Sequence, residues 1–316
     1  MSIDKFECLP DGIYVPVPTF FKNDEDYTLD LDNQLRHVKF LYGCGINGVV
    51  LAGSMGESCH LTGEERSLLC ATVRKAIPDP NFKIVLGSPP LSIQDTTKEI
   101  HDGYNAGANF SLLLVPGYFG PHLTSQQGII DYFNLVARNL PLPIIIYNYP
   151  GVSNNVTLSL DTFKQLLQIP QIVGVKLTHF NLDLYILLAS EDKQYKLKNF
   201  KPFTGLGQVL VPAMSIGVKG AIDGLANVFP KSMLRILELY KQCQYEEVAK
   251  LQYQVTRANQ MISELNVVGI KLALKEIYGF GDCTSGRPPL NREANKEIYL
   301  KYSKDLAALL EIEKSI

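Results

Sequence analysis

The stretch Gln171-Ile-Val-Gly-Val-Lys-Leu-Thr178 decides which fold this chain is expected to adopt. Its apolar residues are mostly β-branched, which favours a short buried strand. Lys176 stands near the C-terminal end of that strand. Burying an ammonium group without a partner is costly, so the pKa of Lys176 should fall and its neutral amine should become a nucleophile toward carbonyl groups. The ordinary alternative is a lysine whose amine extends from the strand end into solvent.

The preceding apolar run, Leu142-Pro-Ile-Ile-Ile-Tyr-Asn-Tyr-Pro150, places Tyr147 at its end. The active site of a parallel barrel lies at the C-terminal ends of its strands. Two consecutive buried strands that each carry a reactive side chain at that end are therefore typical of a barrel enzyme. Lys176 and Tyr147 together predict such a barrel, with a site built around both side chains.

The rest of the chain repeats this pattern of a strand followed by a helix at intervals of roughly 25–35 residues. The predicted strands cover residues 12–20, 48–52, 83–87, 110–115, 142–147, 171–176, 200–204 and 220–224. The predicted helices cover residues 30–42, 63–76, 92–105, 124–138, 159–168, 181–190 and 208–216. Asp30, Ser92 and a Thr62–Glu65 capping box mark three helix starts.

Eight such units predict an α/β fold, a (β/α)₈ TIM barrel, over residues 1–228. Residues 229–316 show three helical patterns and no convincing strand, so we expect them to form the last barrel helix and a C-terminal helical extension. The alternative is an open, doubly wound sheet. It is disfavoured because no Gly-x-Gly-x-x-Gly motif opens the first helix and because eight units favour closure.

The composition excludes several classes of partner. The chain has 316 residues, of which 46% are hydrophobic and 20% charged, and its net charge is −2. This balance predicts neither nucleic-acid binding nor attraction to an anionic membrane. The apolar runs are too short to cross a bilayer, and Met1–Glu7 shows no secretory signal. Six scattered cysteines without Cys-x-x-Cys spacing predict reduced thiols in a cytoplasmic protein.

Further polar residues follow the other strand ends. Gly53 and Gly56 allow a tight loop after the second strand, whose backbone N–H groups can converge on an anion such as a carboxylate. Tyr118 follows the fourth predicted strand, and Asp223 and Asn227 follow the eighth. No two His, Cys or carboxylate side chains at these ends have the spacing of metal ligands, so we expect neither a catalytic metal nor another cofactor.

Most histidines are expected away from this site. His179 lies just beyond Lys176 and could reach the mouth of the barrel. The other four fall in predicted helices or loops, where a surface position is expected: His37, His60, His101 and His122.

Three motifs stand in an order and spacing that resemble a known family. They are Gly53-Ser-Met-Gly-Glu57, Tyr147-Asn-Tyr-Pro150 and Gly174-Val-Lys176. Together they resemble the dihydrodipicolinate synthase/N-acetylneuraminate lyase family of pyruvate-dependent class I aldolases. The resemblance covers the barrel, roughly residues 12–228, and the helical tail is similar to the C-terminal helices of that family.

The resemblance implies a role for each matching residue. Lys176 would form a Schiff base with the C2 carbonyl of pyruvate or another 2-keto acid. Tyr147 would shuttle protons, and Ser54 would be its relay partner. The backbone N–H groups of Ser54 and Met55 would hold the pyruvate carboxylate. Tyr118 matches a tyrosine that some members insert across a subunit interface, and the family likeness implies a homo-oligomer, either a dimer or a tetramer.

Departures from the family pattern narrow the range of expected substrates. Dihydrodipicolinate synthases usually carry an Arg where Val152 stands here, and this Arg binds a substrate carboxylate. We therefore favour cleavage of a 2-keto-3-deoxy sugar acid to pyruvate and an aldehyde. Hydrogen bonds to its hydroxylated tail would come from residues at the strand ends: Thr178, His179, Asp223 and Asn227. The alternatives are a 4-hydroxy-2-oxoglutarate aldolase, a dihydrodipicolinate synthase, a metal-dependent class II aldolase, or a catalytically silent barrel that only binds keto acids.

Overall fold

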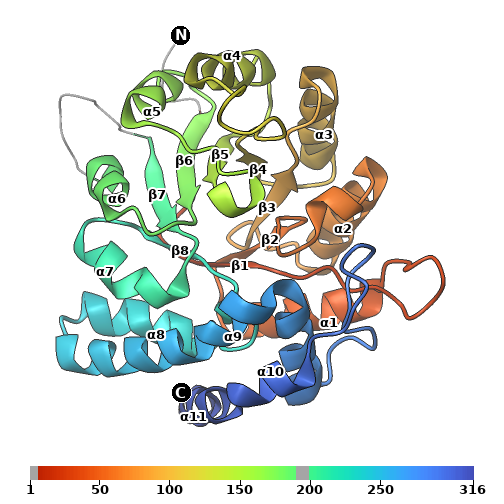
Figure 1. Ribbon diagram of the computed structural model, residues 1–316, viewed down its shortest axis with the longest axis vertical. Coiled ribbons are helices and arrows are strands. Elements are labelled where there is room, and N and C mark those ends of the chain that lie inside the picture. Colours follow the sequence, from red (N-terminus) through yellow and green to blue (C-terminus); the bar gives the residue numbers. More distant parts are fainter. Residues whose placement is uncertain (1–5, 190–198) are drawn as a thin grey trace.

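Eight parallel strands close into a barrel in the order of the sequence (Figure 1). The computed structural model describes residues 6–189 and 199–316. The strands are β1 (Gly12–Pro16), β2 (Gly48–Leu51), β3 (Lys83–Ser88), β4 (Phe110–Leu114), β5 (Ile144–Asn148), β6 (Ile172–Leu177), β7 (Lys201–Thr204) and β8 (Gly220–Ile222). Strand β1 pairs with both β2 and β8, which closes the ring. The predicted barrel is therefore confirmed, and the open sheet is excluded.

Helices follow the strands and cover the outside of the barrel. They are α1 (Leu31–Gly43), α2 (Gly63–Ala76), α3 (Ile93–Asn105), α4 (Gln126–Val136), α5 (Leu160–Leu166), α6 (Leu182–Ala189), α7 (Leu210–Ser215) and α8 (Pro230–Lys241). The predicted caps are confirmed, because Asp30, Thr62 and Ser92 each accept a backbone N–H of the first helical turn. Residue 190, the last of a predicted helix, lies outside the described residues.

Two details of the predicted elements are wrong. The first strand ends at Pro16 rather than at residue 20, because Pro16 and Pro18 have no N–H to donate to a sheet. Residues 230–316 form four helices instead of three, and Tyr302 separates the last two of them. After α8 come α9 (Tyr245–Tyr278), α10 (Lys296–Lys301) and α11 (Ser303–Ser315).

The apolar side chains form two separate cores. Alternate strand residues point inward and fill the barrel, among them Tyr14, Ile145 and Phe203. Their neighbours point outward and pack against the surrounding helices, as Ile144 and Ile146 of β5 do. This division follows from the two-residue period of a strand.

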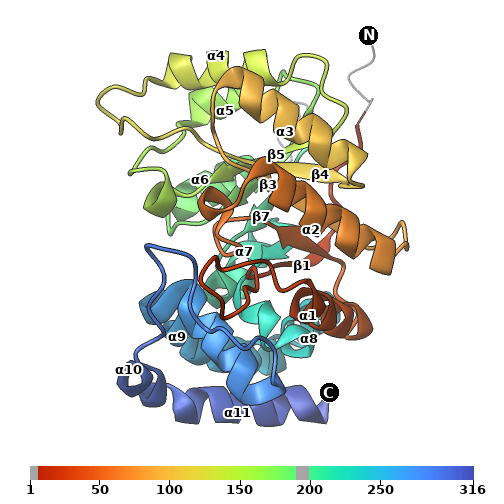
Figure 2. The same ribbon diagram turned by 90° about the vertical axis from the view of Figure 1, so that its right-hand side faces the viewer.

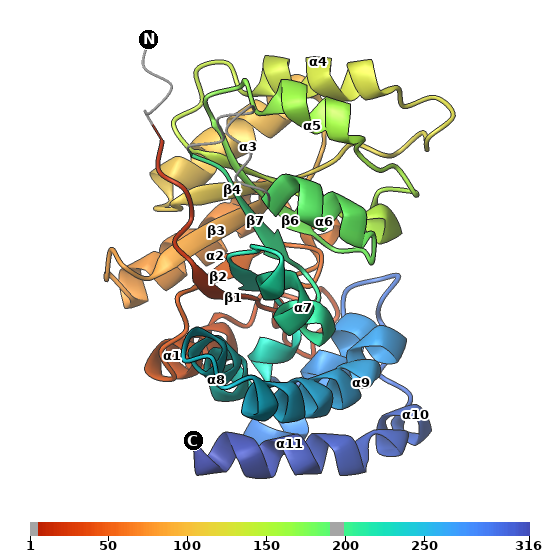
Figure 3. The same cartoon turned by 90° about the vertical axis from the view of Figure 1, so that its left-hand side faces the viewer.

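The C-terminal helices form a layer beside the barrel. Figures 2 and 3 show α8 and α9 between the barrel and α11, which lies at the edge of the molecule. The long helix α9 contacts α8 and α11 and two short turns at the barrel mouth, η3 (Gly207–Val209) and η4 (Leu225–Asn227). It is kinked at Asn266, whose φ of 50° and ψ of −136° are not helical. No helix in the described parts of the chain has the length and apolar sequence needed to cross a bilayer.

The last helix supplies the N-terminal cap of α8. Phe229, at the start of α8, offers no side-chain acceptor. The buried carboxylate of Glu313 in α11 accepts the backbone N–H groups of Lys231 (2.8 Å) and Ser232 (2.7 Å) and also the hydroxyl of Ser232 (2.6 Å). A negative charge at a helix N-terminus is favoured by the helix dipole. Glu313 therefore anchors α11 to the last barrel helix.

We expect Glu313→Gln to lower the free energy of unfolding by roughly 1–2 kcal/mol, because the amide has no charge and one acceptor oxygen fewer. Denaturant unfolding of the purified protein measures the change. Glu311→Gln in the same helix is the matched control, since its side chain is 78% exposed and should have little effect. Equal midpoints for the two variants would contradict the capping role of Glu313.

One histidine lies where the sequence did not place it. His37, predicted at the surface, is fully buried between Phe20 and Phe280, and its Nε2 lies 3.2 Å from the carbonyl oxygen of Asn227. Burial lowers the pKa of His37 to about 4. The surface prediction is wrong because α1 turns this position toward the apolar core. His101 and His122 are exposed, whereas His60 is half-buried.

The folded protein holds His37 neutral, whereas the unfolded chain protonates it near its ordinary pKa of 6.5. Stability from this group is therefore complete above about pH 6.5 and falls as the pH drops toward 4, by a total of roughly 3 kcal/mol. We expect His37→Gln, although less stable at neutral pH, to lose this part of the pH dependence. Unfolding titrations of both proteins across that range measure it, and parallel curves would disprove the assignment.

Candidate active site

An irregularity in β6 directs Lys176 into the barrel. Ile144 of β5 pairs with Ile172, but the next residue, Ile145, pairs with Gly174, so β6 has one extra residue at Val173. Such a bulge reverses which residues face inward beyond it. Lys176 then pairs with the inward-facing Tyr147. Without the bulge, a strict two-residue alternation from Val173 would have turned the lysine outward.

The amine of Lys176 is enclosed and close to Tyr147. Lys176 is 3% exposed, and its Nζ lies 4.3 Å from the centre of the Tyr147 ring. Burial lowers the pKa of Lys176 to about 7, and the carboxylate of Asp223 opposes this shift by favouring the charged form. A substantial fraction of the amine is therefore neutral, and so nucleophilic, near neutral pH.

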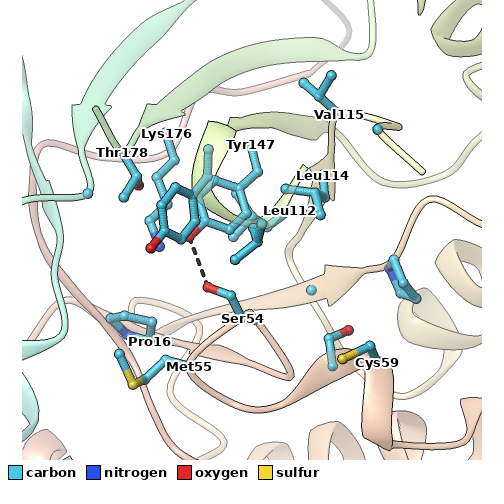
Figure 4. A pocket seen from close by; sticks show the side chains of 18 of the residues that line it. Pro16, Ser54, Met55, Cys59, Leu112, Leu114, Val115, Tyr147, Lys176 and Thr178 are labelled. Carbon is cyan, nitrogen blue, oxygen red and sulfur yellow. Dashed lines mark hydrogen bonds between the residues drawn. The ribbon is translucent and has the colours of Figure 1, made fainter. Parts of the chain in front are cut away.

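Tyr147 and Ser54 form a hydrogen-bonded pair opposite this lysine. The two hydroxyl oxygens are 2.9 Å apart, the contact drawn as a dashed line in Figure 4. Tyr147 and Lys176 come from neighbouring strands, whereas Ser54 approaches from the loop after β2 (Figure 4). Burial raises the pKa of Tyr147 to about 12, with the Ser54 hydrogen bond opposing the shift. Tyr147 thus carries its proton at neutral pH and has a hydroxyl partner through which protons can move.

The Ser54 loop has the geometry of an anion site. In the parts of the chain that the structure describes, the backbone N–H groups of Ser54 and Met55 have no acceptor. Both residues line the cavity that also contains Lys176. Free N–H groups of adjacent residues can converge on a carboxylate.

Thr178 and Asp223 also line the cavity. The Oγ1 of Thr178 is buried, and its hydroxyl acts together with that of Ser54 against the rise in the pKa of Tyr147. Asp223 is 2% exposed and accepts the N–H groups of Gly207 (2.7 Å) and Leu225 (2.9 Å). Burial raises the pKa of Asp223, although these hydrogen bonds act in the opposite direction. Its place beside Lys176 favours an electrostatic role over direct contact with a hydroxylated tail.

Two predicted residues lie apart from this centre. Asn227 is fully buried outside the cavity lining, where its amide donates to the carbonyl oxygens of Pro16 (3.0 Å) and Gly224 (2.8 Å). It therefore ties β1 to the turn after β8. Tyr118 stands at the outer rim of the cavity and is 91% exposed, packed edge-on against Phe119. In a single chain, Tyr118 is too exposed to take part in the Ser54–Tyr147 pair, whose tyrosine is buried.

His179 reaches the cavity, but its ring nitrogens are occupied. The backbone N–H of Asn181 donates to Nδ1 at 3.2 Å, and Nε2 lies 3.3 Å from the side-chain amide of Asn148. Burial also lowers the pKa of His179. The imidazole is therefore held neutral and does not offer a positive charge to a substrate.

Sequence reasoning assigned no site residue beyond position 227, yet the C-terminal extension lines part of the cavity. The cavity has a volume of about 1390 Å³. Gln208 of η3 borders it together with three polar residues of α9: Asn259, Ser263 and Asn266. The spacing of four residues places Asn259 and Ser263 on one face of the helix, and Asn266 follows at the kink. This periodic polar stripe was the signal that could have revealed them.

The described residues contain no group of three or more His, Cys, Asp or Glu side chains arranged to hold a metal ion. Lys176 is also the only Lys or Arg among the residues found to line the cavity. An enclosed amine beside hydroxyl groups is able to form an imine and to exchange protons.

The sequence model of the dihydrodipicolinate synthetase family matches residues 9–309. The chain belongs to this family. The resemblance of the three short motifs is thus confirmed over nearly the whole chain, including the C-terminal helices.

Individual family members are similar along most of their length. A protein of Emericella nidulans named "Probable 4-hydroxy-2-oxoglutarate aldolase, mitochondrial" is 33% identical over 86% of this chain and 87% of its own. An Aspergillus niger protein named "L-threo-3-deoxy-hexylosonate aldolase" is 29% identical over 98% of both chains. Among solved structures, a dihydrodipicolinate synthase family protein from Coccidioides immitis is 30% identical, covers 98% of this chain and 99% of its own, and superposes with a TM-score of 0.84.

The pKa of Lys176 should appear directly in the kinetics of imine formation. Only the neutral amine attacks a carbonyl, so the rate with pyruvate should rise with pH to a midpoint near 7 and then level off. Samples reacted at different pH values and quenched into borohydride at one fixed pH measure this rate. Asp223→Asn should move the rise to lower pH, because Asp223 favours the protonated amine. Asp161→Asn is the control, because its side chain is 83% exposed, and it should leave the pH dependence unchanged. A rate of imine formation that rises only above about pH 9 would contradict the lowered pKa of Lys176.

Proposed function

We propose that the protein is a Schiff-base (class I) aldolase, a carbon–carbon lyase that reversibly cleaves a 2-keto-3-deoxy sugar acid to pyruvate and an aldehyde. The observation that carries this proposal is the buried amine of Lys176, with a pKa lowered to about 7, beside the hydrogen-bonded pair of Tyr147 and Ser54. The substrate carboxylate binds to the free backbone N–H groups of Ser54 and Met55, and the hydroxyl of Thr178 lies in the same cavity.

The reaction follows from these positions. The neutral amine of Lys176 attacks the C2 carbonyl, and loss of water gives an iminium ion, with Tyr147 donating the proton that the leaving hydroxyl needs. The resulting phenolate takes the proton of the C4 hydroxyl. The electrons of the C3–C4 bond then flow into the iminium, which leaves an enamine and releases the aldehyde. Protonation at C3 and hydrolysis return pyruvate and the free amine, and condensation is the reverse path.

The cavity wall favours a substrate with an uncharged tail. Val152 lines the cavity at the position where a synthase would present an Arg, and Lys176 must remain free to react. The cavity lining instead offers neutral groups from Gln208, Asn259 and Ser263. Neutral amides and hydroxyls suit the hydrogen bonds of a polyol.

A 4-hydroxy-2-oxoglutarate aldolase is the second candidate. It is favoured by the name of the relative that is 33% identical over 86% of the chain. Its substrate carries a second carboxylate, for which a bidentate partner would be worth roughly 1.5–3 kcal/mol. We rank the sugar acid first and dihydrodipicolinate synthase activity third, because Lys176 is the only Lys or Arg in the described cavity lining.

We also propose that the protein assembles as a homo-oligomer, a dimer or a tetramer, in the cytoplasm. Tyr118, Phe119 and Leu123 form an exposed apolar rim beside the cavity, and α6 exposes Ile186 and Leu187. Exposed apolar patches of this kind suit contacts between subunits. If a partner subunit covers the rim, Tyr118 becomes buried next to the site, as the family likeness implies. The word "mitochondrial" in a relative's name makes cell fractionation the test of location.

The Schiff base can be tested by trapping. Incubation with pyruvate and borohydride should add the mass of one reduced pyruvate per chain, and Lys176→Ala should abolish the adduct because no other amine is described in the cavity lining. Lys219→Ala, outside that lining, is the control and should label fully. An adduct that persists in Lys176→Ala would refute the proposed chemistry, and failure of native protein to label would favour the silent barrel.

The preference of the enzyme among substrates, measured as kcat/KM, should depend on whether the cavity wall offers a positive charge. We expect a higher kcat/KM for cleaving 2-keto-3-deoxy hexonates than for condensing pyruvate with aspartate semialdehyde. Val152→Arg should raise kcat/KM for the dicarboxylic 4-hydroxy-2-oxoglutarate by about tenfold or more, since a charge-assisted pair is gained. Val152→Gln, similar in reach but uncharged, is the control. A native preference for the semialdehyde would overturn the substrate assignment while leaving the imine chemistry intact.

A further inference from the structure

The loop that holds Ser54 has a strained backbone. Ala52 and Glu57, at its two ends, have positive φ angles of 49° and 56°, although neither is glycine. Such conformations cost roughly 1 kcal/mol or more each and persist only where surrounding contacts impose them. Two backbone hydrogen bonds at the loop, from Glu57 to Ser54 and from Ser58 to Gly53 (both 3.1 Å), hold part of this conformation, and contacts from outside the loop hold the rest.

The carboxylate of Glu57 is the centre of those contacts. It is fully buried and accepts three hydrogen bonds: from Lys271 Nζ at 2.6 Å, from His60 Nδ1 at 3.0 Å and from the backbone N–H of Arg287 at 2.9 Å. Only His60 belongs to the same region of the sequence. Lys271 and Arg287 come from the C-terminal extension, more than 200 residues away.

Lys271 is equally enclosed. Its side chain is 1% exposed, and it also donates to the carbonyl oxygen of Ser285 at 3.0 Å and lies 4.6 Å from the centre of the Phe21 ring. It stands in α9 just beyond the kink at Asn266, on the segment that also borders the cavity. The ion pair therefore joins the strained loop directly to the helix that forms another part of the cavity wall.

We propose that Glu57 and Lys271 are positioning residues for the aldolase reaction, an inference that rests on the proposed function. Neither touches the reacting atoms. Their buried ion pair holds the loop in the conformation that aims the N–H groups of Ser54 and Met55 at the substrate carboxylate and the Ser54 hydroxyl at Tyr147. The C-terminal extension is by this means part of the active site and not only a cover for the barrel.

The small net stability of a buried ion pair makes it possible to test its positioning role separately from its effect on folding. A buried ion pair contributes little net stability compared with neutral groups of similar shape, whereas removal of one partner leaves an uncompensated buried charge. The double variant Glu57→Gln/Lys271→Met removes both charges and nearly keeps the shape. We expect it to unfold close to the native temperature, and each single variant to be much less stable.

The kinetics of that double variant test the inference. Loss of the ion pair should let the loop relax, so KM for pyruvate should rise at least tenfold and kcat should fall, because small displacements of positioned groups are costly. Glu57→Asp, which keeps the charge but shortens the side chain by one methylene, should show the same two changes in a folded protein. Glu313→Gln is the matched control, since it removes a buried carboxylate that does not line the cavity and should lower stability without changing KM or kcat.

Each result decides one question. Native KM and kcat in a folded double variant, or in Glu57→Asp if the double variant does not fold, would overturn the positioning role. Changes in KM and kcat in Glu313→Gln as large as those in Glu57→Asp would overturn it as well, because they would reflect lost stability alone. Borohydride trapping of native protein keeps the two proposals apart: no adduct refutes the aldolase itself, whereas a native adduct with unchanged variant kinetics refutes only the role of the ion pair.

Discussion

Burial of the Lys176 amine inside the barrel is the constraint on which the rest of the structure depends. A lysine in this position lacks water, which lowers its pKa to about 7 and makes it reactive near neutral pH. The bulge in β6 points it inward, and the buried carboxylate of Asp223 limits the cost of its charged form. The same enclosure raises the pKa of Tyr147 and leaves it paired with Ser54. One desolvated space thus sets the protonation states of both groups.

A second enclosed charge extends this arrangement beyond the barrel. The ion pair of Glu57 and Lys271 connects the Ser54 loop to α9, and Glu313 connects α11 to the start of α8. In both cases a buried carboxylate satisfies donors from a distant part of the chain. An unpaired buried charge is costly. Such contacts therefore favour one arrangement of the C-terminal helices against the barrel over other arrangements that would separate the paired groups.

Much of this architecture was accessible from the sequence, because strand and helix periodicity and helix caps are local properties. The eight strands, the caps at Asp30 and Thr62 and the family motifs follow from residues close together in the chain. The misplaced residues depend on distant contacts. His37 is buried because Phe280 packs on it, and Asn227 is turned into contacts with Pro16, away from the cavity. Neither neighbour could be identified from local pattern.

The sequence by itself determined the fold class and the order of the elements, and it made Lys176 and Tyr147 the candidate reactive residues, since apolar runs that end in such side chains carry that information locally. The tertiary structure alone decided which way Lys176 points, how far its pKa falls and which residues complete the cavity wall. These depend on a single extra residue in β6 and on contacts across more than 200 positions, between Glu57 and Lys271. Desolvation and ion pairing are set by all the atoms around a group, and most of those atoms belong to residues far away in the sequence.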